Sequence, residues 1–151
     1  MKVAIGADHN GFELKNIICK FLEEKGVEYK DFGTYSKEPI DYPDIAKVVA
    51  EAVVEGEFDR GILICGTGLG MAIAANKVKG IRAATCHDVY SAERARKSNN
   101  AQIMTMGAQI IGPELAKMLV DAWLRSEFQG GRSTPKVEKI MKIEEENFSR
   151  R

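Results

Sequence analysis

Residues 60–77 have the sequence RGILICGTGLGMAIAANK, in which an apolar run is followed by three alternating glycines and then by a helix-forming segment. The run from Ile62 to Cys65 is apolar without alternation, which is typical of a strand buried on both faces of a parallel sheet. The alternating glycines predict a tight turn directly after that strand. A buried strand that turns at once into a helix is the repeating unit of α/β proteins.

The rest of the chain repeats this alternation on both sides. Apolar runs predict strands at 3–7, 27–32, 82–86 and 102–105, and helical spacing predicts helices at 12–25, 44–54, 71–77, 91–97, 113–125 and 134–147, with Asp44 as an N-cap. Such alternation requires right-handed crossovers. We therefore predict an α/β, Rossmann-like three-layer sandwich with a five-stranded, mostly parallel sheet and a C-terminal helix.

Length and composition indicate one domain over residues 1–151. Hydrophobic residues make up 44% of the chain, and 22 Lys and Arg balance 22 Asp and Glu. This neutrality removes the broad field expected of a nucleic-acid binder or an anionic-membrane binder. The apolar stripe of the C-terminal segment, 133–149, is too thin for a core, so we expect it to pack on another subunit or on the domain surface.

The three cysteines are Cys19, Cys65 and Cys86, without a CxxC motif or a Cys/His pairing at zinc spacing. Neither a disulfide framework nor a metal site is therefore predicted, and a reducing cytoplasm fits best. The apolar run at the start of the sequence is too short for the hydrophobic region of a signal sequence. No apolar window approaches the length of a membrane span.

In open parallel sheets, ligands bind beyond the carboxyl ends of the strands. Asp8 and His9 follow the first predicted strand, and Cys65 ends the third. We expect Ser98 and Asn99, which precede the fifth strand, to join them at this edge.

Each motif alone has two interpretations. The glycines at 66, 68 and 70 expose N–H groups that could hold an anion, or they form only a tight turn; the spacing is neither a Walker A nor a dinucleotide fingerprint. Cys65, beside a helix N-terminus, is a candidate base or nucleophile, or else a small core hydrophobe. Asp8 and His9 could contact a sugar and a phosphate, or form a capped turn.

The remaining candidates are equally open. Arg132 and Lys136 could clamp a phosphate or be a solvated charge pair. His87 and Asp88 are interpreted as a helix cap at the surface.

Taken together, GADHNGF (6–12), DYPD (41–44), ICGTGLG (64–70) with AANK (74–77), and FQGGR (128–132) closely resemble the ribose-5-phosphate isomerase type B family. That family also contains the galactose-6-phosphate isomerase subunits. The likeness covers nearly the whole chain in the family's order, so it is more specific than any single motif.

The resemblance implies a cofactor-free isomerase of the pentose phosphate pathway, interconverting ribose 5-phosphate and ribulose 5-phosphate through an enediolate. It also implies a homodimer or tetramer that binds a sugar phosphate, without nucleic acid, membrane or metal. Cys65 would be the base that moves a proton between C1 and C2. One branch of the family instead has Glu at the position of Met71, which cannot take a proton.

The resemblance assigns the site residue by residue. The catalytic group is Cys65, Thr67 and Ser98, and the substrate-binding group is Asp8, His9, Tyr42, Gly66, Gly68, Leu69, Gly70, Asn99, Gln109, Arg132 and Lys136. Three positions depart from the family's pattern. Ser98 replaces a His assigned to ring opening, and Gln109 and Lys136 each replace an Arg.

Three alternatives remain open at this stage. The substrate could be a hexose phosphate such as allose 6-phosphate or galactose 6-phosphate. The chain could also be a non-catalytic phosphate- or nucleotide-binding module, or a partner kept for a hetero-oligomer.

Overall fold

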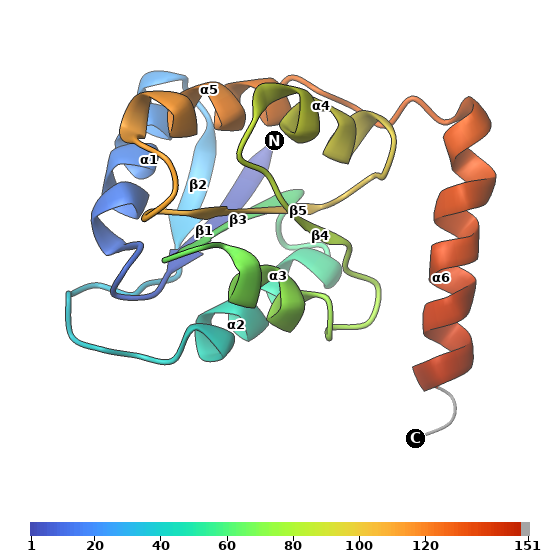
Figure 1. Ribbon diagram of the computed structural model, residues 1–151, viewed down its shortest axis with the longest axis horizontal. Coiled ribbons are helices and arrows are strands. Elements are labelled where there is room, and N and C mark those ends of the chain that lie inside the picture. Colours follow the sequence, from blue (N-terminus) through green and yellow to red (C-terminus); the bar gives the residue numbers. More distant parts are fainter. Residues whose placement is uncertain (149–151) are drawn as a thin grey trace.

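A single five-stranded sheet forms the centre of the structure, a computed structural model that describes residues 1–148 (Figure 1). The strands are β1 (Lys2–Ala7), β2 (Glu28–Asp31), β3 (Arg60–Cys65), β4 (Ala83–Thr85) and β5 (Ile103–Gly107), in the spatial order β2-β1-β3-β5-β4. Every pairing is parallel, so the prediction of a mostly parallel sheet is confirmed and extended. All six residues of the central strand β3 are buried.

Helices cover both faces of this sheet. They are α1 (Phe12–Glu24), α2 (Tyr42–Val54), α3 (Leu69–Ala75), α4 (Val89–Lys97), α5 (Pro113–Leu124) and α6 (Thr134–Phe148), with the 3-10 turn η1 (Gly131–Ser133) before α6. Figure 1 shows α1, α4 and α5 on one face and α2 and α3 on the other, which is the predicted three-layer arrangement.

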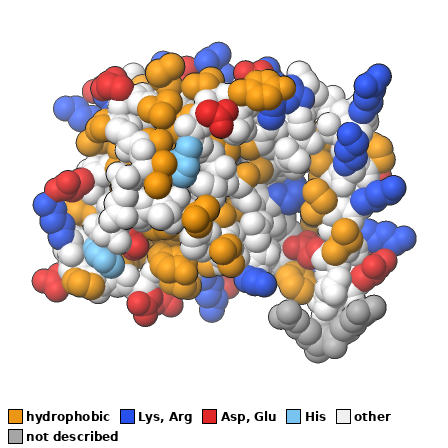
Figure 2. All heavy atoms as spheres, in the orientation of Figure 1, with side chains coloured by type: hydrophobic (Ala, Val, Ile, Leu, Met, Phe, Trp, Pro, Cys, Tyr) orange, Lys and Arg blue, Asp and Glu red, His pale blue; other side chains and the backbone are white. Residues whose placement is uncertain are grey.

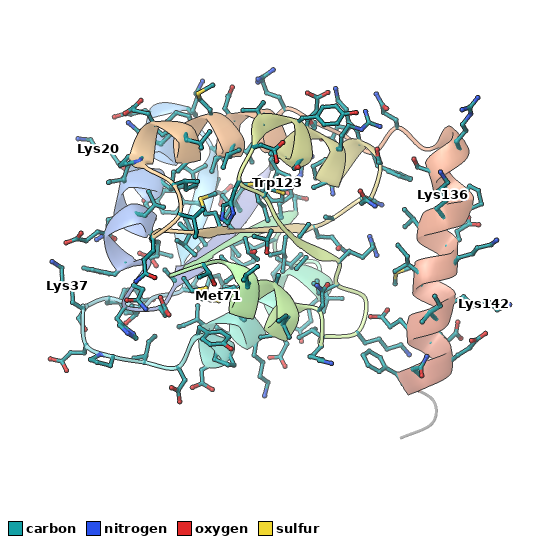
Figure 3. The ribbon with its side chains drawn as sticks, in the orientation of Figure 1. Lys20, Lys37, Met71, Trp123, Lys136 and Lys142 are labelled. Atoms are coloured by element: carbon teal, nitrogen blue, oxygen red, sulfur yellow. The ribbon has the colours of Figure 1, made fainter. Side chains whose placement is uncertain are left out.

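Each face has its own apolar core. Trp123 of α5 is fully buried on the α1–α4–α5 side, and Met71 of α3 is fully buried on the other side (Figure 3). Alternate residues of β3 contribute to the two cores, Ile62 and Ile64 to one and Leu63 and Cys65 to the other. The unalternating sequence of this strand is thus explained by burial on both faces.

Several helix boundaries differ from the sequence prediction: α3 and α4 begin two residues earlier than predicted, at Leu69 and Val89, and α2 begins at Tyr42. Asp41, not Asp44, occupies the N-cap position of α2, and Asp44 lies in the first turn. Pro43 is compatible with this start, because the first turn of a helix needs no N–H from that residue. The predicted C-terminal segment 133–149 contains α6, but its last residue lies outside the described residues.

The helix α6 lies at the side of the layered body (Figure 1). Val137 is buried, whereas Ile140 and Ile143 are 44% and 61% exposed. Figure 2 shows Lys and Arg side chains gathered along this side of the molecule. Within residues 1–148, none of the helices combines the length and apolar composition needed to cross a membrane.

A buried ion pair ties α1 to the end of the edge strand β2. Lys15 is completely buried, and its Nζ lies 2.6 Å from Oδ2 of Asp31. The other carboxylate oxygen of Asp31 accepts the N–H of Gly33 at 2.8 Å, and its carbonyl accepts the hydroxyl of Tyr35. The pair therefore holds the start of the loop between β2 and α2, which leads to the carboxyl edge of the sheet.

We predict that Asp31→Ala lowers the free energy of unfolding by about 3 kcal/mol, because it leaves the Lys15 ammonium buried without its counter-charge. Urea denaturation measures the change. Lys25→Met is the matched control, because Lys25 and Asp121 form an exposed pair at 3.4 Å, and it should cost less than about 1 kcal/mol. Equal losses in the two variants would contradict the prediction.

Candidate active site

An open cavity of about 290 Å³ lies at the carboxyl ends of β1 and β3. Its eight lining residues come from four different segments of the chain: Asp8, Asn10, Tyr42, Cys65, Gly66, Thr67, Gly70 and Gln109. All of them except Asn10 belong to the site proposed from the sequence. Parallel strands end at one edge of the sheet, which is why segments distant in sequence meet here.

Cys65 lines this cavity from the last position of the buried strand β3. The residue is only 5% exposed, and its Sγ accepts a hydrogen bond from the N–H of Gly68 at 3.1 Å. This hydrogen bond fixes the position of the sulfur beside the backbone N–H groups of the turn. The local arrangement therefore suits Cys65 to accept a proton from a bound molecule.

The backbone at Gly68 makes this hydrogen bond possible. Gly68 has φ +79°, a left-handed conformation that residues with a Cβ rarely adopt, and a Cβ here would lie 2.8 Å from the carbonyl carbon of Met106. The turn is therefore pressed directly against β5. The N–H groups of Leu69 and Gly70 lie in the first turn of α3, where no carbonyl of the helix accepts them. The N–H of Leu69 donates instead to Oγ1 of Thr67 at 3.3 Å.

Asp8 follows β1 and is 4% exposed. Its Oδ1 accepts the N–H groups of Asn10 at 2.9 Å and Gly11 at 3.1 Å, so the capped-turn interpretation is correct. This turn does not exclude ligand binding, because the same side chain lines the cavity and has a second oxygen.

His9 is held by the loop that precedes α2. Its Nδ1 accepts the N–H of Ile40 at 3.1 Å. Since Nδ1 is the acceptor, the neutral imidazole carries its proton on Nε2 and can donate it to a ligand oxygen.

Gln109 lies beside the glycine turn. Its N–H donates to the carbonyl of Gly66 at 2.9 Å, and a Cβ on Gly66 would lie 2.9 Å from its Oε1. Its side chain brings an amide to the cavity but no charge. Among the eight lining residues in the described chain, none is Lys or Arg, so a phosphate bound here would need a cation from elsewhere.

The expectation that Ser98 and Asn99 lie at this edge is wrong for a single chain. They follow α4 and precede β5, and in an all-parallel sheet the start of β5 lies at the opposite edge from Cys65. Ser98 accepts the Nε–H of Arg94 at 2.8 Å, and Asn99 lines a separate cavity of about 230 Å³ with Thr85 and Cys86.

Arg132 and Lys136 also lie outside the cavity. Arg132 is in η1 and Lys136 is on α6, both exposed, and Figure 3 shows Lys136 on the helix at the side of the body. One chain therefore does not combine these cations with His9.

Asn10 is the lining residue that the sequence interpretation missed. It directly follows Asp8 and His9 at the end of β1, so its position next to a strand end was the available signal. The helix-cap interpretation is confirmed for Asp88, which accepts the N–H of Ser91 at 2.7 Å, but not for His87, which is half-buried and whose Nε2 accepts the N–H of Gly107 at 2.9 Å. Among residues 1–148, no group of three or more His, Cys, Asp or Glu residues is placed to hold a metal ion.

The chain matches the Ribose/Galactose Isomerase family over residues 3–140. It is 58% identical over 147 residues to the Ribose-5-P isomerase B of Listeria innocua, covering 97% of this chain and 99% of that protein. It is 56% identical over 142 residues to the D-erythrulose-4-phosphate isomerase of Pectobacterium atrosepticum, covering 93% of each.

Solved structures show the same similarity. The ribose-5-phosphate isomerase B of Clostridium thermocellum has a TM-score of 0.96 and 53% identity, covering 97% of this chain and 99% of that chain. The enzyme of the same name from Mycoplasma genitalium, solved with bound ribulose-5-phosphate, has a TM-score of 0.91 and 38% identity, covering 96% and 97%.

We predict that iodoacetamide alkylates Cys65 first near neutral pH. Burial raises the pKa of Cys19 to about 11 and that of Cys86 to about 12, so both remain thiols. Cys65 lines an open cavity and receives the Gly68 hydrogen bond. Peptide mass spectrometry identifies the modified site, and Cys65→Ser is the control that should abolish early labelling. Labelling of Cys19 or Cys86 at the same rate would contradict the prediction.

Proposed function

Because the chain belongs to the ribose/galactose isomerase family, we propose that it interconverts ribose 5-phosphate and ribulose 5-phosphate without a cofactor. The observation that supports this most is the position of the Cys65 sulfur, at a cavity and within a turn of backbone N–H donors. A proton transfer next to a carbonyl needs a base close to the carbon and donors close to the carbonyl oxygen. Both come here from residues 65–70.

In the proposed first step, the Cys65 thiolate takes the proton from C2 of the open-chain aldose. The C–H electron pair forms the C1–C2 double bond, and the C1 carbonyl oxygen becomes an oxyanion. The N–H groups of Leu69 and Gly70 are the donors for that oxyanion. Asp8 and the Nε2–H of His9 orient the hydroxyl and phosphate groups.

In the second step, a proton moves from the C2 hydroxyl to the oxygen on C1, and the Cys65 thiol returns its proton to C1. The product is the ketose, and the thiolate is regenerated. In this proposal the hydroxyl of Thr67, a residue that lines the cavity, carries the proton between the two oxygens. Met71 is buried in the core and contributes no base.

The phosphate requires cations that the cavity of one chain lacks. We propose a homodimer in which Arg132 and Lys136 of a second copy reach this cavity, with Ser98 and Asn99 of that copy completing it. Two observations on the C-terminal segment support this dimer. Arg132 and Lys136 are exposed, and so are the apolar side chains of Ile140 and Ile143 on α6. Lys136 and Gln109 in place of Arg leave one guanidinium for the phosphate.

A tetrose phosphate is a second candidate substrate, because a relative of 56% identity is named for D-erythrulose 4-phosphate. The catalytic step is the same proton transfer, since only the carbons beyond the reacting pair differ. A panel of ribose 5-phosphate, erythrulose 4-phosphate, allose 6-phosphate and galactose 6-phosphate separates the candidates by kcat/KM. Preferred turnover of either hexose phosphate would overturn the proposed substrate.

We predict that Cys65→Ala abolishes isomerisation, with a loss of kcat of at least about a thousandfold, because it removes the proposed base, while the Asp8 carboxylate in the same cavity is held by the N–H groups of Asn10 and Gly11. Turnover is measured with ribose 5-phosphate, and circular dichroism checks the fold. Cys19→Ala, a core substitution away from the cavity, is the control that should keep activity. Unimpaired turnover by Cys65→Ala would overturn the mechanism, and tight binding of nucleotides without turnover would favour a binding module.

We further predict complementation between two impaired variants, Cys65→Ala and Arg132→Ala. After joint unfolding and refolding in equal amounts, half the dimers are mixed, and each mixed dimer has one site with both native residues. Activity should therefore recover to about a quarter of wild type. No recovery above the sum of the separate variants would show that both residues act within one chain or that the chain stays monomeric.

A further inference from the structure

Two threonine hydroxyls on neighbouring strands converge on the carbonyl of Gly68. Oγ1 of Thr105, on β5, donates to this carbonyl at 2.8 Å, and Oγ1 of Thr85, on β4, lies 2.8 Å from Oγ1 of Thr105 and 3.3 Å from the same carbonyl. Thr85 and Thr105 are paired in register across the two strands. Neither residue was part of the site derived from the sequence, and neither lines the cavity of Cys65.

We propose that Thr105 is a positioning residue that orients the peptide between Gly68 and Leu69 for the reaction. In a trans peptide, the carbonyl and the N–H point in opposite directions. Holding the Gly68 carbonyl toward the interior of the sheet therefore turns the Leu69 N–H outward, to the side of Thr67, whose Oγ1 accepts it at 3.3 Å. That N–H is one of the oxyanion donors in the proposed function, on which this inference rests.

The same anchor acts on Cys65 through Gly68. The Gly68 carbonyl is held by Thr105 while the Gly68 N–H donates to Sγ of Cys65 at 3.1 Å. Gly68 has no side chain to restrict its backbone, and its positive φ is a conformation that glycine leaves readily. These two hydrogen bonds hold the residue from opposite sides, together with the N–H of Ala72, which also donates to the Gly68 carbonyl at 3.2 Å.

Of the donors to the Gly68 carbonyl, the Thr105 hydroxyl makes the shortest contact, and it comes from the sheet rather than from α3. Thr105 is completely buried, so its hydroxyl has no water to exchange for the carbonyl. A Cβ on Gly107, two residues further along β5, would lie 2.6 Å from Cα of Thr67, which shows how closely the turn packs on the end of this strand. The N–H of Gly107 in turn donates to Nε2 of His87 at 2.9 Å. The end of β5 is thus a fixed support for the turn.

Thr85 has a secondary part in this arrangement. Its hydroxyl can donate to Oγ1 of Thr105 and so leave the Thr105 proton directed at the Gly68 carbonyl. Thr85 lies on the edge strand and is half-buried, and its own distance to that carbonyl is longer. Loss of this hydroxyl should therefore affect the peptide less than loss of the Thr105 hydroxyl.

The test compares Thr105→Val with Thr105→Ser. Valine keeps the shape and β-branching of threonine and removes only the hydroxyl, whereas serine keeps the hydroxyl. We expect Thr105→Val to lower kcat by roughly tenfold, less than the loss of a direct oxyanion donor, and to change KM by less than about twofold. Thr105→Ser should stay within about twofold of wild type, and Thr85→Val should fall between them.

A second measurement does not depend on the substrate. The rate of Cys65 alkylation by iodoacetamide near neutral pH should fall severalfold in Thr105→Val and be restored in Thr105→Ser, because a displaced Gly68 no longer donates to the sulfur. Ser126→Ala is the matched control: it removes a buried hydroxyl that donates to the carbonyl of Ala122 at 2.7 Å, at the opposite end of the sheet. It should change neither kcat nor alkylation.

The outcomes separate the two proposals. Wild-type protein without turnover of any sugar phosphate would overturn the proposed function, while the alkylation rates would still test Thr105. Normal kcat and normal alkylation in Thr105→Val would overturn the positioning role. Equal losses in Thr105→Val and Ser126→Ala would assign the effect to general stability and would also overturn it.

Discussion

The parallel hydrogen bonding of β3 between β1 and β5 is the constraint on which the rest of this structure depends. It buries all six residues of β3 and divides their side chains between two separate cores. Because β1, β3 and β5 run in one direction, the residues after each of them emerge at the same edge. Asp8, Cys65 and the Gly107–Gln109 segment meet there for that reason and not through any local sequence preference.

The turn from Gly66 to Gly70 is built as a rigid extension of this sheet. It rests on the end of β5 so closely that neither Gly68 nor Gly107 has room for a side chain. Hydrogen bonds then hold Gly68 from both sides, through Cys65 and Thr105. Preorganised donors stabilise charge that develops during a reaction without the cost of reorientation at that moment. The proposed base and its oxyanion donors are thus held in place by the same element, the end of β5.

The cationic side chains proposed to bind the phosphate lie apart from the cavity and its glycine turn. The cavity contains a carboxylate, a thiol, hydroxyls and amides, while Arg132 and Lys136 lie on the segment that leaves the layered body (Figure 1). In the proposed dimer, the proton-transfer groups come from one chain and most of the charge for the phosphate comes from the other. Substrate affinity would then depend on assembly, whereas the geometry of the base would not.

The sequence by itself determined the order of strands and helices, the buried central strand and the residues that follow β1 and β3, because hydrophobic periodicity and glycine spacing report local structure and burial. It misplaced Ser98 and Asn99, since strand order and direction determine which edge a loop occupies. It gave no sign of Thr105 or Thr85, which look like ordinary strand residues until β4 and β5 pair in register. Only the tertiary structure decided which side chains meet at the Gly68 carbonyl, because that contact joins residues separated by 37 positions, and local patterns carry no information on such distant contacts.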